Sequence, residues 1–130
     1  MKHVALKLFV AATFSVVGVE IAHAHHSFAA TYFVDQEVTT KGTITEFLYR
    51  NPHSFMKVDA TDSKGQMQTW TVEWGGGAQL SQDHISRDTL RPGDVVTISG
   101  NPGRNPAEHR MRLHKIVRAS DNWTWEGVIM

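Results

Sequence analysis

The chain has 130 residues, a formal net charge of zero and no cysteine. This length gives room for one domain, and the lack of cysteine excludes disulfide bonds, thiolate metal sites and a lipid-modified amino-terminal cysteine. The balanced charge argues against nucleic acid as a partner, because non-specific binding to phosphates needs a basic surface.

Residues 1–24 have the pattern of a cleavable signal peptide. Lys2 and Lys7 form a short positive region, a mostly apolar run follows, and Ala22-His23-Ala24 has the small-x-small pattern that signal peptidase cleaves. The alternative is a membrane anchor, but polar residues interrupt the run, which falls short of the roughly 20 apolar residues that a span needs. We therefore expect cleavage after Ala24 and a periplasmic or secreted domain at residues 25–130, without a stable membrane span.

Cleavage changes the charge balance only slightly. Residues 1–24 contain two lysines and one glutamate, so the remaining 106 residues carry 11 basic and 12 acidic side chains. The expectation that nucleic acid is not a partner therefore also holds for the mature domain.

The rest of the sequence is typical of short β-strands separated by glycine, proline and aspartate turns. Strict alternation puts Val58 and Lys57 on opposite faces of one predicted strand, and Trp74 and Glu73 on opposite faces of the next. The predicted strands are residues 38–49, 55–61, 67–74, 95–99 and 110–119, and the one predicted helix, between the third and fourth strands, is residues 78–85. This order is that of the OB-fold, an all-β, five-stranded, partly open Greek-key barrel. The alternative is another small antiparallel barrel or sandwich.

Two glycine positions carry specific expectations. Gly42 lies inside the first predicted strand and predicts a bulge or a sharp bend. Gly75-Gly76-Gly77 predicts a strand exit with unusual φ values rather than a phosphate-binding loop, because it matches neither nucleotide-binding fingerprint.

Four histidines are candidate metal ligands. His25, at the expected new amino terminus, offers both an α-amine and an imidazole to one metal, and such nitrogen ligands suit copper, nickel and zinc. This arrangement resembles the amino-terminal histidine of copper-dependent polysaccharide monooxygenases. His26 is adjacent, and in an OB barrel His53 and His109 lie in the two loops that flank the binding face. The alternative is that these histidines are ordinary surface or hydrogen-bonded residues.

The same fold predicts a ligand-binding face on the barrel. Its candidate residues are Arg50, Asn51, Phe55, Trp70 and Glu73. Aromatic side chains on such faces bind ligands by stacking, but Trp70 also alternates with apolar residues as a barrel interior does.

The sequence lacks the common catalytic signatures. It has no nucleophile elbow, no cysteine nucleophile and no pair of carboxylates at a spacing typical of catalysis. We therefore expect a noncatalytic periplasmic binding protein whose ligand the sequence does not name, with a transition metal such as copper as the favoured class. The alternatives are a module that binds a peptide, glycan or other envelope component, and an exported copper-dependent enzyme.

Several short motifs together resemble one family. They are His-His-Ser-Phe-Ala-Ala-x-Tyr at residues 25–32, Lys-Gly-Thr-Ile-Thr at 41–45, Asn-Pro-His at 51–53, the strand around Trp70, and Leu-Arg-Pro-Gly-Asp at 90–94. The mature chain is similar over nearly its whole length to bacterial exported proteins catalogued as a domain of unknown function, number 6152. The resemblance implies an exported β-barrel and supplies no catalytic residues.

Overall fold

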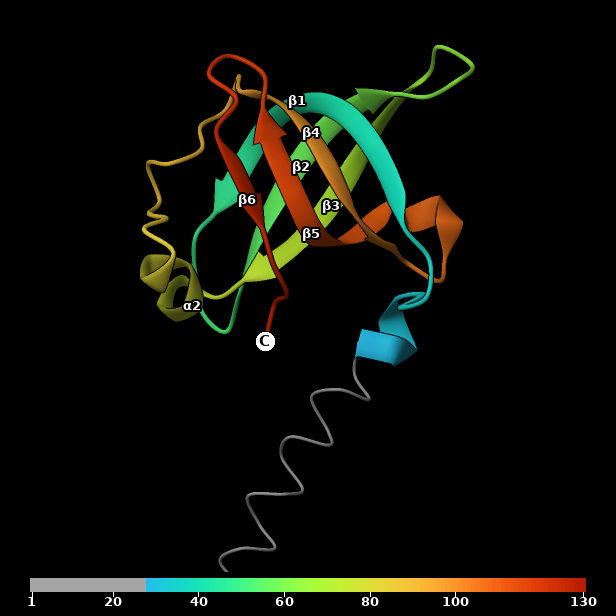
Figure 1. Cartoon of the computed structure of the whole chain (residues 1–130). Coiled ribbons are helices and arrows are strands. Elements are labelled where there is room, and N and C mark those ends of the chain that lie inside the picture. Colours follow the sequence, from blue (N-terminus) through green and yellow to red (C-terminus); the bar gives the residue numbers. More distant parts are fainter. Residues whose placement is uncertain (1–27) are drawn as a thin grey trace, which may run out of the picture. The chain divides into compact units, whose positions relative to one another are not determined.

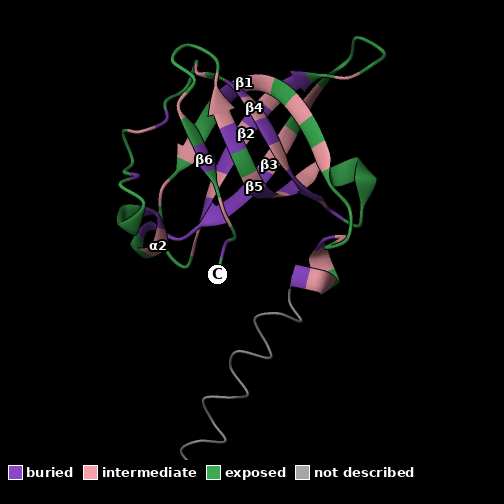
Figure 2. Ribbon diagram, viewed as in Figure 1, coloured by how far each residue is buried: buried purple, intermediate pink, exposed green. Residues whose placement is uncertain are grey.

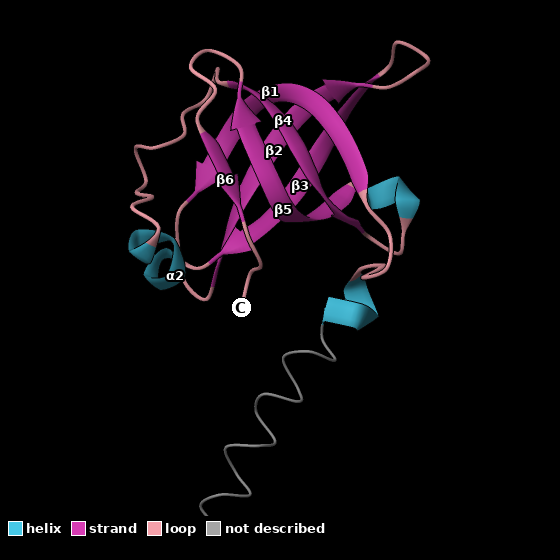
Figure 3. Cartoon of the chain, in the orientation of Figure 1, coloured by secondary structure: helices cyan, strands magenta, loops and turns pink. Residues whose placement is uncertain are grey.

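The computed structural model describes residues 28–130, so the expected cleavage site lies outside the described residues. Residues 28–31 are helical and belong to one compact unit, and Tyr32–Met130 forms the other. Within the second unit the strands are β1 (Val38–Leu48), β2 (His53–Thr61), β3 (Met67–Gly75), β4 (Val95–Pro102), β5 (Arg110–Arg118) and β6 (Thr124–Glu126) (Figure 1). Helix α2 (Gly77–Gln82) lies between β3 and β4, and the 3-10 helix η1 (Pro106–Glu108) between β4 and β5 (Figure 3).

The first five strands close into a barrel. The hydrogen-bonded order is β3-β2-β1-β4-β5-β6, and an additional pairing of β3 with β5 joins the two ends of the five-stranded sheet. That closing pair is parallel, with Thr71 opposite Arg110 and Glu73 opposite Arg112, whereas the other strand pairs are antiparallel. The predicted OB-like, all-β barrel with one short helix between its third and fourth strands is therefore confirmed. The short strand β6, which pairs with β5, was not predicted.

Strand β1 pairs with two neighbouring strands and curves strongly along its length (Figure 1). Its first half, from Val38 to Thr43, pairs with β4, and the half from Thr43 to Leu48 pairs with β2. The sequence predicted the bulge or bend at Gly42. The register between β1 and β2 instead shifts between Ile44 and Glu46, so the bulge lies beyond Gly42. Gly42 instead permits a close approach of two backbones, since a Cβ there would lie 2.3 Å from the backbone oxygen of Asp59.

The core fills the inside of the barrel, and Figure 2 shows buried residues alternating mostly with half-buried ones along β2 and β5. Met56, Val58 and Val72 have no exposed surface, as the alternation predicts. Trp74 is also fully buried, and its ring packs edge-to-face on Trp125 of β6 at a centroid distance of 5.2 Å. Burying one such apolar side chain contributes about 1.5–3 kcal/mol, which is how a domain of this size is stable without disulfides.

Helix α2 is shorter than predicted, and it ends before His84. That residue has a φ of 59° and follows the helix rather than lying on it. Across the residues that the structure describes, no helix combines the length and apolar character needed to cross a membrane.

Candidate functional site

The outer surface of β2, β3 and β5 gathers polar and charged side chains, because the core uses the alternate positions of each strand. Val72 is fully buried, so Thr71 and Glu73 on either side of it point to the opposite face of β3. Phe55 pairs with Glu73 on one side, and Arg110 pairs with Thr71 on the other. Side chains from three strands therefore meet on one side of the barrel.

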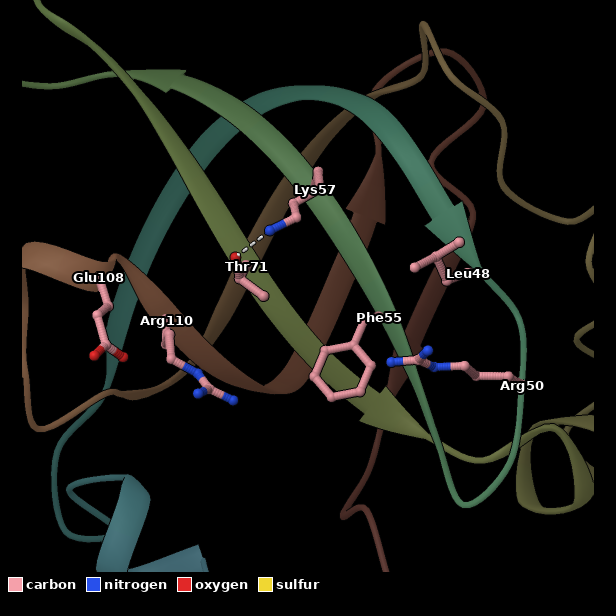
Figure 4. Close-up of a pocket in the computed structure, with 7 residues that line it drawn as sticks. All are labelled: Leu48, Arg50, Phe55, Lys57, Thr71, Glu108 and Arg110. Carbon is pink, nitrogen blue, oxygen red and sulfur yellow. Dashed lines mark hydrogen bonds between the residues drawn. The ribbon is translucent and has the colours of Figure 1, made fainter.

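This side of the barrel is hollowed, and we call the hollow the outer groove. It has a volume of about 510 Å³ and is lined by Leu48, Arg50, Phe55, Lys57, Thr71, Glu108 and Arg110 (Figure 4). Figure 4 shows the guanidinium groups of Arg50 and Arg110 pointing toward Phe55 from opposite sides. The Cζ atom of Arg50 lies 5.1 Å from the centroid of the Phe55 ring, within the range of a cation–π contact.

The outer groove concentrates positive charge. Arg50, Lys57 and Arg110 are basic, and Glu108 is the single acidic residue in its lining as described. The whole chain, by contrast, has a net charge of zero. Guanidinium groups bind carboxylates and phosphates through paired N–H donors. The groove therefore suits an anionic group joined to a part that can lie against Phe55.

Glu73 lies next to Phe55 across the ladder, and its carboxylate oxygens contact other groups of the barrel wall. Its Oε1 lies 2.6 Å from Nδ1 of His53, and Tyr32 donates a hydrogen bond of 2.5 Å to its Oε2. Arg110 Nη2 lies 4.0 Å from the same Oε2. Burial, and then the hydrogen bond to Glu73, raises the pKa of Tyr32, so its hydroxyl remains a donor.

His53 is held from both sides of its ring. Its Nδ1 faces the Glu73 carboxylate, and its Nε2 lies 3.2 Å from the backbone oxygen of Met130. Carboxylates commonly orient metal-binding histidines in this way, through the nitrogen that does not bind the metal. Within residues 28–130, however, no group of three or more His, Cys, Asp or Glu side chains is placed to hold a metal ion.

The turn before His53 is fixed by the glycines that follow β3. Gly77 donates its N–H to the backbone oxygen of Arg50 at 3.0 Å, and Ala78 donates its N–H to Oδ1 of Asn51 at 3.1 Å. A Cβ on Gly76 would lie 2.2 Å from the backbone oxygen of Pro52. The side chain of Asn51 therefore anchors the turn.

The expectation of unusual φ values in this glycine run was wrong. Gly76 has a φ of −66°, and the positive-φ glycines of the described chain are Gly65 and Gly93. Small residues are required here because the turn and the strand exit pack closely, not because the backbone is left-handed.

A second hollow, which we call the aromatic groove, has a volume of about 550 Å³. Its rings come from Phe33, Trp70 and His109, and Arg104 and Arg110 are its basic residues. The rings of Trp70 and His109 meet edge-to-face at 5.6 Å, and Cζ of Arg104 lies 4.6 Å from the centroid of Phe33. Arg110 lines both grooves.

The structure divides the candidate residues predicted from sequence. Arg50 and Phe55 share the outer groove, and Glu73 lies beside them. Trp70 lies on the other side of β3 and lines the aromatic groove with His109. His53 has Glu73 and Met130 as neighbours, whereas His109 contacts Trp70. His25 and His26 lie outside the described residues, so the metal site stays a prediction.

Sequence reasoning missed four residues: Tyr32, Lys57, Arg104 and Arg110. The alternation of β2 already placed Lys57 on the outward face, so this signal was available. The position of Arg110 depends on the pairing of β3 with β5, and that of Tyr32 on a contact across 41 positions in sequence. No local pattern encodes these last two.

Comparison with known proteins gives a match to a family model but none to a curated protein. A family model described as "Family of unknown function (DUF6152)" matches residues 14–112, which include β1 to β4 and the first residues of β5. Its match covers well over half of the sequence and confirms the resemblance found from the short motifs. The chain therefore belongs to the family of unknown function DUF6152.

Proposed function

We propose that this chain is a noncatalytic binding protein of the bacterial periplasm, and that its outer groove captures an anionic ligand. One observation carries the proposal: two arginines point toward Phe55 from opposite sides, and Lys57 lies in the same groove. The periplasmic location rests on the signal-peptide pattern of residues 1–24.

The neighbouring side chains favour a ligand over an internal ion pair. Glu73 is the nearest buried carboxylate, and it is already bound by Tyr32 and His53. Arg110 Nη2 lies 4.0 Å from it, at the limit of an ion pair, and the Arg110 side chain remains 35% exposed. A bound anion would supply acceptors close to this guanidinium.

The test is a titration of the exported protein with citrate and with inorganic phosphate. Binding is measured by amide NMR shifts and by calorimetry. Replacement of a guanidinium that binds an anion removes about 1.5–3 kcal/mol, so Arg50→Gln and Arg110→Gln should each weaken the affinity at least about tenfold. Arg91→Gln is the matched control, since Arg91 is an exposed arginine outside the groove lining. Affinity should also fall as salt is added.

Two outcomes would remove the proposal. One is an absence of binding by both anions. The other is equal affinity in the Arg50→Gln, Arg110→Gln and Arg91→Gln variants, because binding would then not involve the groove.

A second candidate function, binding of a transition metal, is favoured by the contact between His53 and Glu73. The carboxylate holds Nδ1 at 2.6 Å and thereby fixes the orientation of the ring. The remaining ligands would be His26 and the amine and imidazole of His25, which requires cleavage after Ala24.

Native mass spectrometry of the exported protein would give its first residue and any bound metal. Titration with Cu(II) should then show an affinity well above that of a His53→Ala variant with a blocked amino terminus. Equal affinities would remove the metal proposal. A turnover assay on the copper-loaded protein tests the alternative of an exported copper enzyme.

A further inference from the structure

The two grooves are neighbours on the barrel because they share one side chain. Arg110 lines the outer groove of about 510 Å³ and the aromatic groove of about 550 Å³. Arg110 is the first residue of β5, and it pairs with Thr71 of β3. A ligand that occupies both grooves would therefore contact Arg110 in each of them.

The charged side chains that line the two grooves have one sign almost throughout. Arg50, Lys57 and Arg110 line the outer groove, and the aromatic groove adds Arg104. Among the described residues that line the two grooves, Glu108 is the one acidic side chain. This distribution is complementary to a ligand that carries several negative charges along its length.

The aromatic groove differs from the outer groove in offering rings. Trp70 is half-buried, with His109 against its edge, and Phe33 lies under the guanidinium of Arg104. Flat aromatic surfaces with a few polar groups at their margin bind molecules that have both an apolar face and polar edges. A sugar ring has this character, since its C–H groups form an apolar face and its hydroxyls lie around the rim.

An extended peptide fits the outer groove less well. Peptides commonly bind a β-domain by adding a strand to an unpaired sheet edge. Here β2 lies between β1 and β3, and β3 is paired with both β2 and β5 over Thr71–Glu73. The floor of the outer groove therefore has no free backbone edge for a peptide to extend.

From these observations we infer that the ligand is an acidic oligosaccharide that lies across both grooves, with carboxylates at Arg50 and Arg110 and a sugar ring in the aromatic groove. This inference rests on the proposed function, because it assumes that the outer groove binds anions. It adds the chemical class and length of the ligand and a second set of contacts.

The experiment compares probes of matched chemistry by calorimetry on the exported protein. The probes are galacturonate, tetragalacturonate, neutral cellotetraose, a hexaglutamate peptide and a short oligothymidylate. Tetragalacturonate should bind at least about tenfold more tightly than galacturonate, because a second set of contacts is joined to the first. It should also bind more tightly than each of the other three probes.

Variants assign the two ends of the ligand. Arg50→Gln should weaken both galacturonate and tetragalacturonate, and Arg104→Gln or Phe33→Ala should abolish most of the advantage of the tetramer over the monomer. Trp70→Ala should do the same, and Phe33 and Arg104 provide the result even where the loss of Trp70 prevents folding. Arg91→Gln should change neither affinity nor their ratio.

The outcomes separate the two proposals. Binding of galacturonate that depends on Arg50, without any gain for the tetramer, would overturn this inference and keep the proposed function. Tighter binding of hexaglutamate or oligothymidylate than of tetragalacturonate would also overturn it, in favour of a peptide or a nucleic acid. Failure of every anionic probe to bind would remove both proposals.

Discussion

The hydroxyl of Tyr32 donates a hydrogen bond of 2.5 Å to the carboxylate of Glu73 and thereby ties the segment that precedes β1 to the wall of the barrel. Both residues are buried, with 1% of Tyr32 and 8% of Glu73 exposed. The bond joins two residues that lie 41 positions apart in sequence. It also fixes the carboxylate that contacts His53, so one buried anion organises the margin of the outer groove.

We expect Tyr32→Phe to lower the free energy of unfolding by about 1.5–3 kcal/mol, because it removes a hydrogen bond to a charged acceptor in a buried place. Tyr49→Phe is the matched control, since the hydroxyl of Tyr49 donates to the neutral backbone oxygen of Gly77 at 2.8 Å. Its expected loss is smaller, about 0.5–1.5 kcal/mol. Urea unfolding measures both, and an equal or smaller loss for Tyr32→Phe would contradict this account.

Alkaline pH gives a second test of the same bond. Burial and the contact with Glu73 raise the pKa of Tyr32 above its usual value of 10.0, whereas in the unfolded chain the phenol loses its proton near the usual value. The unfolded state therefore binds fewer protons than the folded state above about pH 10, and stability falls as pH rises, by up to about 1.4 kcal/mol per pH unit for this group. Unfolding measured between about pH 9 and about pH 11 should show a steeper fall for the wild type than for Tyr32→Phe. Parallel curves of stability against pH for the wild type and Tyr32→Phe would contradict the raised pKa of Tyr32.

Gly76 is expected to be intolerant of any side chain. A Cβ at this position would lie 2.2 Å from the backbone oxygen of Pro52 and 2.8 Å from Oδ1 of Asn51, so the turn must move to admit it. We expect Gly76→Ala to cost about 1–3 kcal/mol of stability and to shift the amide NMR signals of the turn.

Gly65→Ala is the comparison for Gly76→Ala. Gly65 has a φ of 78° and no atom within 4 Å of the position of a Cβ, so the change involves backbone strain without a clash. Its expected cost is about 1–2 kcal/mol, with no change in signals around Pro52. Unchanged signals around Pro52 in Gly76→Ala would show that the close approach is absent.

Trp125 should be a large contributor to stability although it lies in a strand of three residues. Its ring packs on Trp74 at 5.2 Å, and its Nε1 donates to Oδ2 of Asp83 at 2.9 Å. We expect Trp125→Ala to destabilise the fold by about 3–5 kcal/mol in thermal or urea unfolding. Trp123, two positions earlier, is half-buried beside Arg118, so Trp123→Ala should cost clearly less. Equal losses would mean that β6 is not packed on the core.

Arg118 holds Asp121 in its charged form. Two hydrogen bonds join them, from Nε to Oδ1 at 3.0 Å and from Nη2 to Oδ2 at 2.9 Å. These bonds, and then the N–H of Trp123, lower the pKa of the Asp121 carboxyl below its usual value. NMR titration should therefore show Asp121 protonating at lower pH than a free aspartate, and Arg118→Gln should move its pKa upward. Because the pKa is lowered on folding, any stabilisation from this carboxylate is present above its unfolded pKa and is lost as pH falls.

Much of the fold could be predicted because strand alternation is local. Side chains of neighbouring residues point to opposite faces of a strand, so Val58 and Lys57 separated correctly without any knowledge of the fold. The hairpin between β2 and β3 was also predictable, since Asp62 accepts the N–H groups of Lys64 and Gln66 around Gly65. Strand β6 escaped prediction because it is short and its burial comes from contact with Trp74.

The residues of the candidate site were likewise predictable where local sequence sets their position, and not where distant strands must meet. Arg50 and Phe55 were found because they flank a turn whose Asn-Pro-His sequence marks it directly. Trp70 was assigned to the same face, but the pleat of β3 turns it toward the aromatic groove and away from Phe55. The sequence by itself determined which residues of each strand face inward and where the turns lie, because backbone geometry sets these over a few residues. Only the tertiary structure decided that Arg110 meets Thr71 and that Tyr32 meets Glu73, because these contacts form when the barrel closes between distant strands.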